Sequence, residues 1–203
     1  MGTIMSELPD DYPDATGKGD LHIPGAGTFG MALLLVSLTM LFLASIAAFL
    51  IIRVRSAHWP PPGFPPIPNS LWFSTAVILC ASVTIQMAVN AIRRDDEMRL
   101  RRYLWATFYV GIAFLLLQTF NWIEFYMELR GLRIEGAYMG MFYVLTGLHA
   151  AHVLGGLIPL GVVIAKARRG AYSRNFYPGV RYSALYWHFL DIVWLVLFSF
   201  LYF

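Results

Sequence analysis

Residues 28–52 read TFGMALLLVSLTMLFLASIAAFLII and contain no charged side chain. A helix needs about 20 apolar residues to cross the ~30 Å hydrocarbon core of a bilayer, because each residue adds about 1.5 Å. The run exceeds that length and is apolar on every side, which excludes a core strand and fits a helix in lipid. Four further runs of this kind occupy about residues 70–92, 103–127, 138–165 and 183–203. The sequence therefore predicts an all-α fold, a bundle of five transmembrane helices.

The composition agrees with a membrane chain and excludes other classes of protein. Hydrophobic residues make up 58% of the 203 residues and charged residues only 13%, whereas a soluble domain carries roughly 25% charged residues. This excludes intrinsic disorder and an ordinary soluble enzyme, and a net charge of +3 is too small for a basic nucleic-acid-binding domain. The single cysteine, Cys80, lies inside an apolar run, so it supports neither a disulfide framework nor a zinc cluster.

The distribution of basic residues predicts the orientation of the bundle. Eleven of the 15 lysines and arginines fall in the N-terminal tail and in the second and fourth connections, on one side of the membrane, and four fall on the other side. Because positive charge is retained in the cytoplasm, the N-terminus is expected to be cytoplasmic and the C-terminus periplasmic. Arginines of the second connection have a second candidate role, binding anionic lipid headgroups at the inner face: Arg93, Arg94, Arg101 and Arg102.

Two segments outside the helices have distinctive compositions. Residues 1–26 are expected to form a polar cytoplasmic tail, since they are acidic and lack the basic start and apolar core of a secretory signal peptide. Residues 27–203 are expected to form the membrane domain. Within this domain, residues 59–68 read WPPPGFPPIP, a run that cannot be helical and is expected to be a stiff connector.

Ionisable side chains within the helices need an explanation, because their burial in lipid is costly. They come from the last three helices and are Glu124, His149, His152, His188 and Asp191. Gln118 and Asn121 precede Glu124 at intervals of three residues, so these three side chains share one helix face. The two pairs in the later helices also have this spacing. We expect these faces to meet inside the bundle as one polar cluster whose members satisfy each other's hydrogen bonds.

Small residues predict where helices pack closely. In the fourth run, Gly147, Ala151 and Gly155 recur every four residues, as do Gly136 and Gly140. Such spacing lets two helices approach each other closely, so this face is expected to contact a neighbouring helix.

Other roles for the histidines are weaker. A haem held by His152 and His188, as in a stand-alone b-type membrane cytochrome, is disfavoured because they lie about 20 and 8 Å from the inner ends of their helices. A copper site would require cysteines or three convergent histidines, and a proton relay is a further alternative. The sequence contains no nucleophile with its base, no phosphate-binding glycine loop and no inverted repeat of the kind transporters use. No catalytic residue and no metal ligand is therefore predicted.

Two motifs resemble a known family. Residues 142–153 read FYVLTGLHAAHV and residues 186–194 read YWHFLDIVW, and together they resemble the signature of subunit III of haem–copper terminal oxidases. The third run agrees through Gln118 and Glu124, and the first connection agrees through its WPP start. The resemblance extends over about residues 27–202. Five helices in place of seven resemble the shorter bacterial form, which implies a multi-pass protein of the bacterial inner membrane.

The resemblance implies a subunit without redox centres in a complex that reduces oxygen to water and pumps protons in aerobic respiration. Its partners would be the catalytic subunit I, which carries haem and copper, subunit II and possibly a small subunit IV. The family also implies phospholipid bound in a cleft between helices and support of proton uptake at the inner side. The polar cluster, with Trp187 and Trp194 supporting it, would then be structural and would hold no metal.

This sequence says little about the electron donor of the complex, because the donor would bind to other subunits. The YWHF run and the WPP loop resemble the cytochrome c branch more than its relatives. A quinol oxidase subunit III, or an accessory protein of nitric oxide reductase with the same fold, is the alternative. Many family members carry a buried glutamate after a serine in the first of these helices, whereas here Leu38 follows Ser37. Functions tied to that carboxylate are therefore not expected for this chain.

Overall fold

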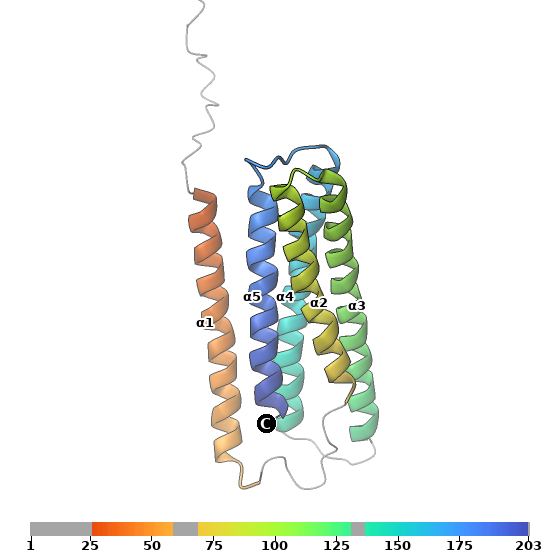
Figure 1. Ribbon diagram of the computed structural model, residues 1–203. Helices are drawn as coiled ribbons and strands as arrows, with labels where there is room; N and C mark the ends of the chain where they lie inside the picture. The colour runs from red at the N-terminus through yellow and green to blue at the C-terminus, as the bar shows by residue number, and fades with distance from the viewer. Residues whose placement is uncertain (1–25, 59–68, 131–136, 203) are drawn as a thin grey trace, which may run out of the picture.

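The computed structural model describes residues 26–58, 69–130 and 137–202, which form five α-helices (Figure 1). The helices are α1 (Ala26–Arg55), α2 (Ser70–Arg93), α3 (Glu97–Arg130), α4 (Ala137–Arg168) and α5 (Pro178–Tyr202). Each is long and apolar enough to cross a membrane, so the predicted all-α fold with five spanning helices is confirmed. The predicted polar tail and the proline-rich connector lie outside the described residues.

Several helices extend beyond their apolar runs because charged residues stabilise their ends. α3 begins at Glu97, well before the apolar run at Tyr103. Asp96 accepts a hydrogen bond from the backbone N–H of Arg99 at 2.9 Å, which caps the helix. Glu97 lies in the first turn, where a carboxylate favours the helix dipole. The apolar run therefore predicts the membrane span, whereas capping residues set the helix end.

Four of the helices form a closed bundle, and α1 lies beside it. α2 packs against α3 and α5, and α4 packs against the same two helices on the opposite side. α1 contacts only α4 and α5 among the described helices, and Figure 1 shows it at the edge of the bundle. The largest fully buried side chains include Trp187, Trp194, Phe114 and Phe142. The core thus lies between α2, α3, α4 and α5, while α1 covers only part of one side.

α1 is tied to α5 near both of its ends. The hydroxyls of Thr28 and Tyr182 lie 3.1 Å apart at one end. Arg53 donates a hydrogen bond to the backbone carbonyl of Phe200, at 3.3 Å, toward the other end. Between these ties, Phe42 of α1 is only 2% exposed. The two ties and this buried ring hold α1 against the bundle.

The closest helix approaches are found at glycines that the sequence pattern does not indicate. A Cβ on Gly156 would lie 2.6 Å from Cε1 of Tyr186, and one on Gly111 would lie 2.7 Å from Cη2 of Trp187. Gly140 and Gly155 face open space instead. The predicted contact is therefore absent at Gly155 but present at Gly147, where a Cβ would lie 3.9 Å from the Trp122 ring of α3, and the closest approach of α5 is one residue away, at Gly156.

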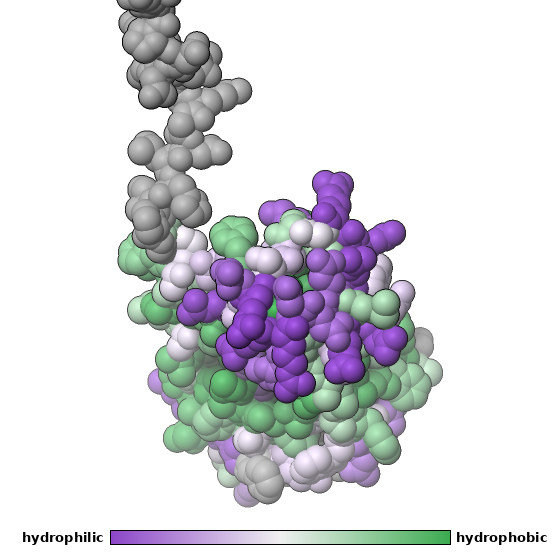
Figure 2. Space-filling view, turned by 45° about the horizontal axis from the view of Figure 1, so that its top comes forward, coloured by the Kyte–Doolittle hydropathy of each residue, from purple (hydrophilic) through white to green (hydrophobic). Residues whose placement is uncertain are grey.

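Hydrophilic residues gather at one end of the molecule. The α2–α3 turn, the α4–α5 connection and the start of α1 lie at the same end (Figure 1). Figure 2 shows hydrophilic residues clustered over this end and hydrophobic residues around the sides of the bundle. A hydrophobic belt below a basic end suits a chain embedded in lipid.

Candidate functional site

A string of hydrogen bonds joins α2 to α5. Ser82 donates a hydrogen bond from Oγ to Oδ2 of Asp191, which is 3% exposed. The same Oγ lies 2.9 Å from Nδ1 of His188, and Nε2 of His188 lies 3.2 Å from Oε1 of Gln86. Gln86 in turn donates to Oδ1 of Asn90 at 3.3 Å. The string thus runs from a buried carboxyl group along α2 toward the basic end.

This string has two consistent arrangements of its protons. Ser82 has a single hydroxyl proton, and Oε1 of Gln86 only accepts, so Nε2 of His188 donates to it. When Ser82 donates to Asp191, Nδ1 of His188 must also donate, and the string holds an imidazolium and a carboxylate. When Asp191 carries the proton and donates to Ser82, Ser82 donates to Nδ1 and every group is neutral. The geometry is therefore compatible with one proton that resides either on His188 or on Asp191.

A second polar group joins α2 to α3. Ser70 donates to Oε2 of Glu124 at 2.8 Å, and Asn121 donates through Nδ2 to Oγ of Ser74 at 2.8 Å. Asn121 and Glu124 therefore face α2 together, as their spacing predicts. Gln118 is fully buried on α3, and its amide atoms have no hydrogen-bond partner among the described residues.

The buried tryptophans reinforce these helix contacts. Trp194 of α5 donates from Nε1 to Oγ1 of Thr75 on α2, at 3.0 Å. Its ring centroid lies 5.0 Å from that of Phe114 on α3, at an edge-to-face angle of 86°. Trp187 of α5 is 1% exposed and packs against the bare backbone of Gly111 on α3. Both tryptophans hold α5 in the centre of the bundle.

The α4 histidines have apolar surroundings. His149 is fully buried, and its ring centroid lies 4.8 Å from that of Trp194 and 5.6 Å from that of Phe114. Neither ring nitrogen of His149 has a hydrogen-bond partner in the described part of the chain. His152 places Nδ1 2.7 Å from the backbone carbonyl of Leu148, one turn back in its own helix.

The predicted single cluster is therefore wrong in its arrangement. Glu124 bonds to α2 near one end, Asp191 and His188 bond to α2 further along, and the α4 histidines bond to neither group. The spacing gave the correct helix faces, but each face meets a different neighbour. α2 supplies the partners, although Arg93 in its last turn is its one charged residue and the partners themselves are uncharged.

Two of the histidines considered for haem lie in different parts of the bundle. His188 faces α2 through Ser82 and Gln86. His152 lies on the α1 side, where its ring is 5.1 Å from that of Phe42. In the described ranges, no three His, Cys, Asp or Glu side chains lie close enough together to hold a metal ion.

A lateral cleft lies between α1, α4 and α5. Its volume is about 620 Å³, and its walls are mostly apolar, with Leu34 and Leu38 on α1 and Gly155 on α4. Lys166 and Tyr182 line it as well and lie near the basic end of α4 and α5. Leu38 thus faces the cleft at the position where many family members were expected to carry a glutamate.

Tyr172, which lies in the α4–α5 connection, also lines this cleft. Its side chain is 7% exposed, and its hydroxyl approaches Gly179 at the start of α5. Burial raises the pKa of Tyr172, so the hydroxyl remains a hydrogen-bond donor across the physiological pH range.

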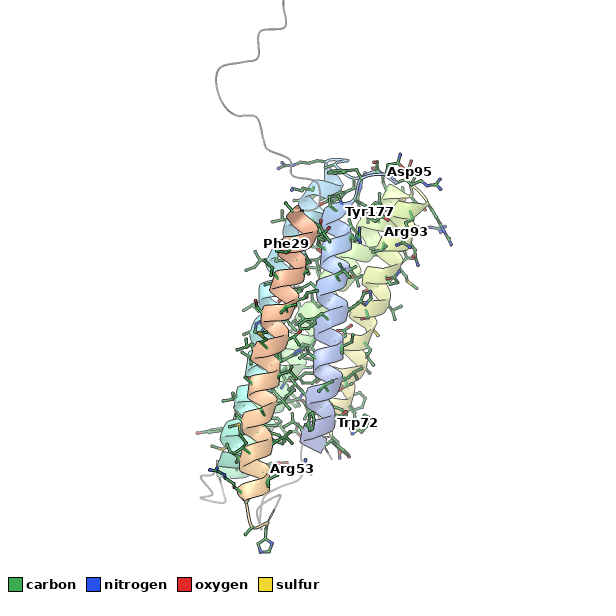
Figure 3. The ribbon with its side chains drawn as sticks, turned by 90° about the vertical axis from the view of Figure 1, so that its left-hand side faces the viewer. Phe29, Arg53, Trp72, Arg93, Asp95 and Tyr177 are labelled. Carbon is green, nitrogen blue, oxygen red and sulfur yellow. The ribbon has the colours of Figure 1, made fainter. Side chains whose placement is uncertain are left out.

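The candidate headgroup arginines lie at the basic end but differ in their partners. Arg93 donates from Nε to the hydroxyl of Tyr177 at 3.3 Å, and Figure 3 shows both residues at the same end as Asp95. Arg101 pairs with Glu97 at 2.5 Å. Arg94 lines a hollow of about 160 Å³. Arg102 is exposed, and neither it nor Arg94 forms an ion pair with another described residue.

Comparison with known proteins places this architecture in one family. The family model described as cytochrome c oxidase subunit III matches residues 14–203. The chain belongs to the cytochrome c oxidase subunit III family. It is 34% identical over 201 residues to cytochrome c oxidase subunit 3 of Synechocystis, covering 98% of this chain and 84% of the relative.

Two further relatives show the same extent of similarity. The chain is 32% identical over 185 residues to cytochrome c oxidase subunit 3 of Thermostichus vulcanus, covering 88% of each protein. It is 33% identical over 193 residues to the probable cytochrome c oxidase subunit 3 of Mycobacterium tuberculosis, covering 90% of each. The resemblance inferred from the two motifs is thus confirmed.

Membership of the subunit III family makes the chain a membrane-embedded subunit of a haem–copper oxidase. The complex is an enzyme, and the other oxidase subunits are the partners of this one. The bundle geometry adds residues that sequence reasoning missed. Ser70, Ser74, Ser82, Gln86 and Asn90 of α2 are separated by four residues or, between Ser74 and Ser82, by eight, and this spacing could have identified α2 as the helix that satisfies the buried acids.

Proposed function

We propose that the chain is a non-catalytic subunit III that stabilises the catalytic subunit of a proton-pumping, oxygen-reducing oxidase in the bacterial inner membrane. The observation that carries this proposal is the family match over residues 14–203 in a chain with five membrane-spanning helices. In this proposal haem and copper reside in subunit I, which packs beside this chain together with subunit II. A small subunit IV would complete the complex.

The engagement of the histidines supports a structural role rather than a redox role. Both ring nitrogens of His188 lie within hydrogen-bond distance of protein oxygen atoms, and Nδ1 of His152 faces a carbonyl of its own helix. His149 is enclosed by the rings of Phe42, Phe114 and Trp194. Because a metal-binding histidine must present a free nitrogen to a shared site with other ligands, this arrangement favours helix packing as the role of these side chains.

Cytochrome c is the electron donor that we propose for the complex. The curated relatives named above are cytochrome c oxidase subunits, which favours this branch over a quinol oxidase or a nitric oxide reductase accessory protein. We assign the support of proton uptake at the inner side by family membership. Leu38 lines the cleft where many members carry a glutamate, so this support must proceed here without that carboxylate.

A deletion strain tests the proposed function. Membranes that lack this chain should lose oxygen consumption progressively during turnover with reduced cytochrome c, while electron transfer by the remaining complex begins at a normal rate. Expression of the wild-type chain should restore sustained turnover. Unchanged activity throughout turnover in the deletion strain, or a defect only with quinol as donor, would contradict the proposal.

Phospholipid is the ligand that we propose for the lateral cleft. Along α4, the cleft extends from Lys166 to His152, which is about 21 Å at about 1.5 Å per residue. One leaflet of the hydrocarbon core is about 15 Å thick, so an acyl chain can fill this length. Lys166 and Tyr182 lie where the phosphate of such a lipid would be, at the basic end.

Two glycine substitutions on α4 test lipid binding in the cleft. Gly155 lines the cleft, and a Cβ there meets nothing within 4 Å, so Gly155→Leu should occupy the cleft without disturbing the fold. Gly161 also faces open space, but it lines a different groove between α3 and α4. Mass spectrometry of the purified complex should show less bound phospholipid for Gly155→Leu than for the matched Gly161→Leu control. Equal lipid content in the two variants would contradict this assignment.

The predicted orientation is part of the same proposal. The basic end formed by the α2–α3 turn and the α4–α5 connection should face the cytoplasm, and Phe203 should lie at the periplasmic side. A periplasm-dependent phosphatase fused after Phe203 should be active, whereas the same enzyme fused within the α2–α3 turn should be inactive. The reverse pattern would show that the orientation is inverted.

A further inference from the structure

Two amide side chains lie exposed on α2 within the part of the helix that spans the membrane. Gln86 lies seven residues before Arg93, about 10 Å along the helix axis at about 1.5 Å per residue. Asn90 lies one turn closer to that end, where it lines the same hollow as Arg94, and both amide side chains are exposed. α2 is 24 residues long, or about 36 Å, and the hydrocarbon core is ~30 Å thick, so Gln86 lies inside the core.

These amides retain hydrogen-bond donors that the described chain does not use. Nε2 of Gln86 carries two hydrogens, and its bond to Asn90 uses one of them. The amide nitrogen of Asn90 donates to no described residue. His188, which is half-buried, accompanies them on α5 with its ring between Ser82 and Gln86. Lipid tails offer no acceptor for such donors, so an exposed amide at this depth requires a protein neighbour.

Exposed hydroxyls elsewhere on the bundle do not need a protein neighbour to accept their hydrogen bonds. Ser37 of α1, Thr119 of α3 and Ser199 of α5 each donate to the backbone carbonyl four residues earlier, at 2.7 to 2.9 Å. Their donors are satisfied within the helix and can face lipid. The groove between α3 and α4, of about 590 Å³, is lined by apolar side chains and Thr119. Of the described helix faces, the one between α2 and α5 is therefore distinguished by exposed amide side chains with unused donors.

We propose that this α2–α5 face, defined by Gln86, Asn90 and His188 with the exposed Leu185 and Ile192, is the surface that packs against a transmembrane helix of the haem-bearing subunit. α2 packs against α5, Gln86 is hydrogen-bonded to both Asn90 and His188, and Leu185, His188 and Ile192 share one face of α5 because they recur at intervals of three and four residues. The partner helix presents hydrogen-bond acceptors opposite Gln86 and Asn90, surrounded by apolar side chains that pack on Leu185 and Ile192. The inference rests on the proposed function as an oxidase subunit and adds the face through which the chain assembles.

Photo-crosslinking in the assembled complex tests this face without disturbing the amides. A photoreactive amino acid is placed at Leu185 or Ile192 on the α2–α5 face, and at Leu116 or Ile158 on the α3–α4 face as matched controls, since all four side chains are exposed. After irradiation of native membranes, the crosslinked partner is identified by mass spectrometry. We expect the haem-bearing subunit from the first pair and lipid from the second pair.

Substitution of the amides tests their hydrogen bonds independently. Asn90→Leu and Gln86→Leu should each weaken the binding of the chain to the complex about tenfold, as expected for loss of a buried hydrogen-bonded contact, and so release it at a lower detergent-to-protein ratio than wild type. Thr119→Val, on the α3–α4 face, should behave as wild type.

Two outcomes overturn the inference, and they differ in what they say of the proposed function. If the haem-bearing subunit copurifies but crosslinks from Leu116 or Ile158 instead, the chain is an oxidase subunit that assembles through another face. The same conclusion follows if the amide variants remain bound as firmly as wild type. If the α2–α5 positions crosslink only to lipid or to a second copy of the chain, and no haem-bearing subunit copurifies, the proposed function fails as well.

Discussion

At the scale of single residues, the interior contains two buried polar side chains whose surroundings differ sharply. Oδ2 of Asp191 has a hydrogen-bond partner in Ser82, although Oδ1 has none, whereas neither ring nitrogen of His149 has a partner among the described residues. A buried polar group stabilises a fold when it is paired and costs free energy when it is not. The two residues should therefore respond in opposite ways to replacement by an apolar side chain.

Asp191→Leu should destabilise the bundle. The change removes the carboxyl group that is bonded to the Ser82 hydroxyl at the buried end of the string, and loss of such a buried partner costs about 1–3 kcal/mol. Thermal unfolding of the detergent-solubilised complex should show a lower midpoint, and less of the chain should assemble. Ser199→Ala is the control on the same helix, because Ser199 is exposed and bonds only to its own helix. An Asp191→Leu variant as stable as this control would contradict the string described above.

His149→Leu should leave stability unchanged or raise it. The ring is packed between Phe114 and Trp194 and forms no hydrogen bond to the described chain, so an apolar replacement removes an unsatisfied group. The unfolding midpoint measured beside the Asp191→Leu variant provides the test. A marked loss of stability would show that His149 has a polar partner from water or from another subunit.

At the scale of helices, the apolar runs predicted each span because lipid imposes a minimum length on a spanning helix. The helix ends could not be read from the same signal, since α3 starts at a capping residue, Asp96, outside the membrane. The polar residues on one face of α2 could have marked that helix as a partner, but the residue that each buried acid contacts could not be predicted from the sequence. Glu124 and Asp191 were therefore recognised as interior groups without their partners on α2.

Gly156→Ala should lower stability more than any other glycine-to-alanine change on α4. The added Cβ would lie 2.6 Å from the Tyr186 ring, and overpacking of this kind costs about 1–3 kcal/mol. Gly155→Ala is the matched control, because it adds the same atom to the adjacent residue, where nothing lies within 4 Å. This control should raise helix stability by up to about 1 kcal/mol. Equal unfolding midpoints for the two variants would contradict the position of the α4–α5 contact.

At the scale of the whole molecule, the basic end and the apolar belt follow from the order of loops and runs, and both were predictable from composition. The position of the lateral cleft could not be predicted from the sequence, because it depends on α1 contacting only α4 and α5. Family membership could be inferred from the two motifs, since their spacing of aromatic, histidine and acidic residues is specific. The face that we propose for assembly with the haem-bearing subunit could be identified only from the packing of α2 against α5.

Neutralising the four candidate headgroup arginines should reduce the anionic lipid retained by the complex. Each basic residue near the inner surface contributes about 1 kcal/mol to binding of anionic lipid, and Arg101 should contribute least because Glu97 pairs with it. Lipid analysis of a variant with Arg93, Arg94, Arg101 and Arg102 changed to Gln provides the measurement. Arg55→Gln, at the opposite end of the bundle, is the control. If the amount of anionic lipid is unchanged, these arginines do not bind headgroups and serve only to set the orientation of the bundle.

The central claim is that this chain is a scaffold within an oxidase and holds no redox centre itself. Purification of the complex through an affinity tag on this chain, with analysis of its subunits and its visible spectrum, tests the claim directly. We expect a large haem-bearing subunit to copurify and to account for all haem and copper, while the separated chain is colourless. Haem or copper bound to the separated chain, or a purified chain that has no haem-bearing neighbour, would contradict the claim.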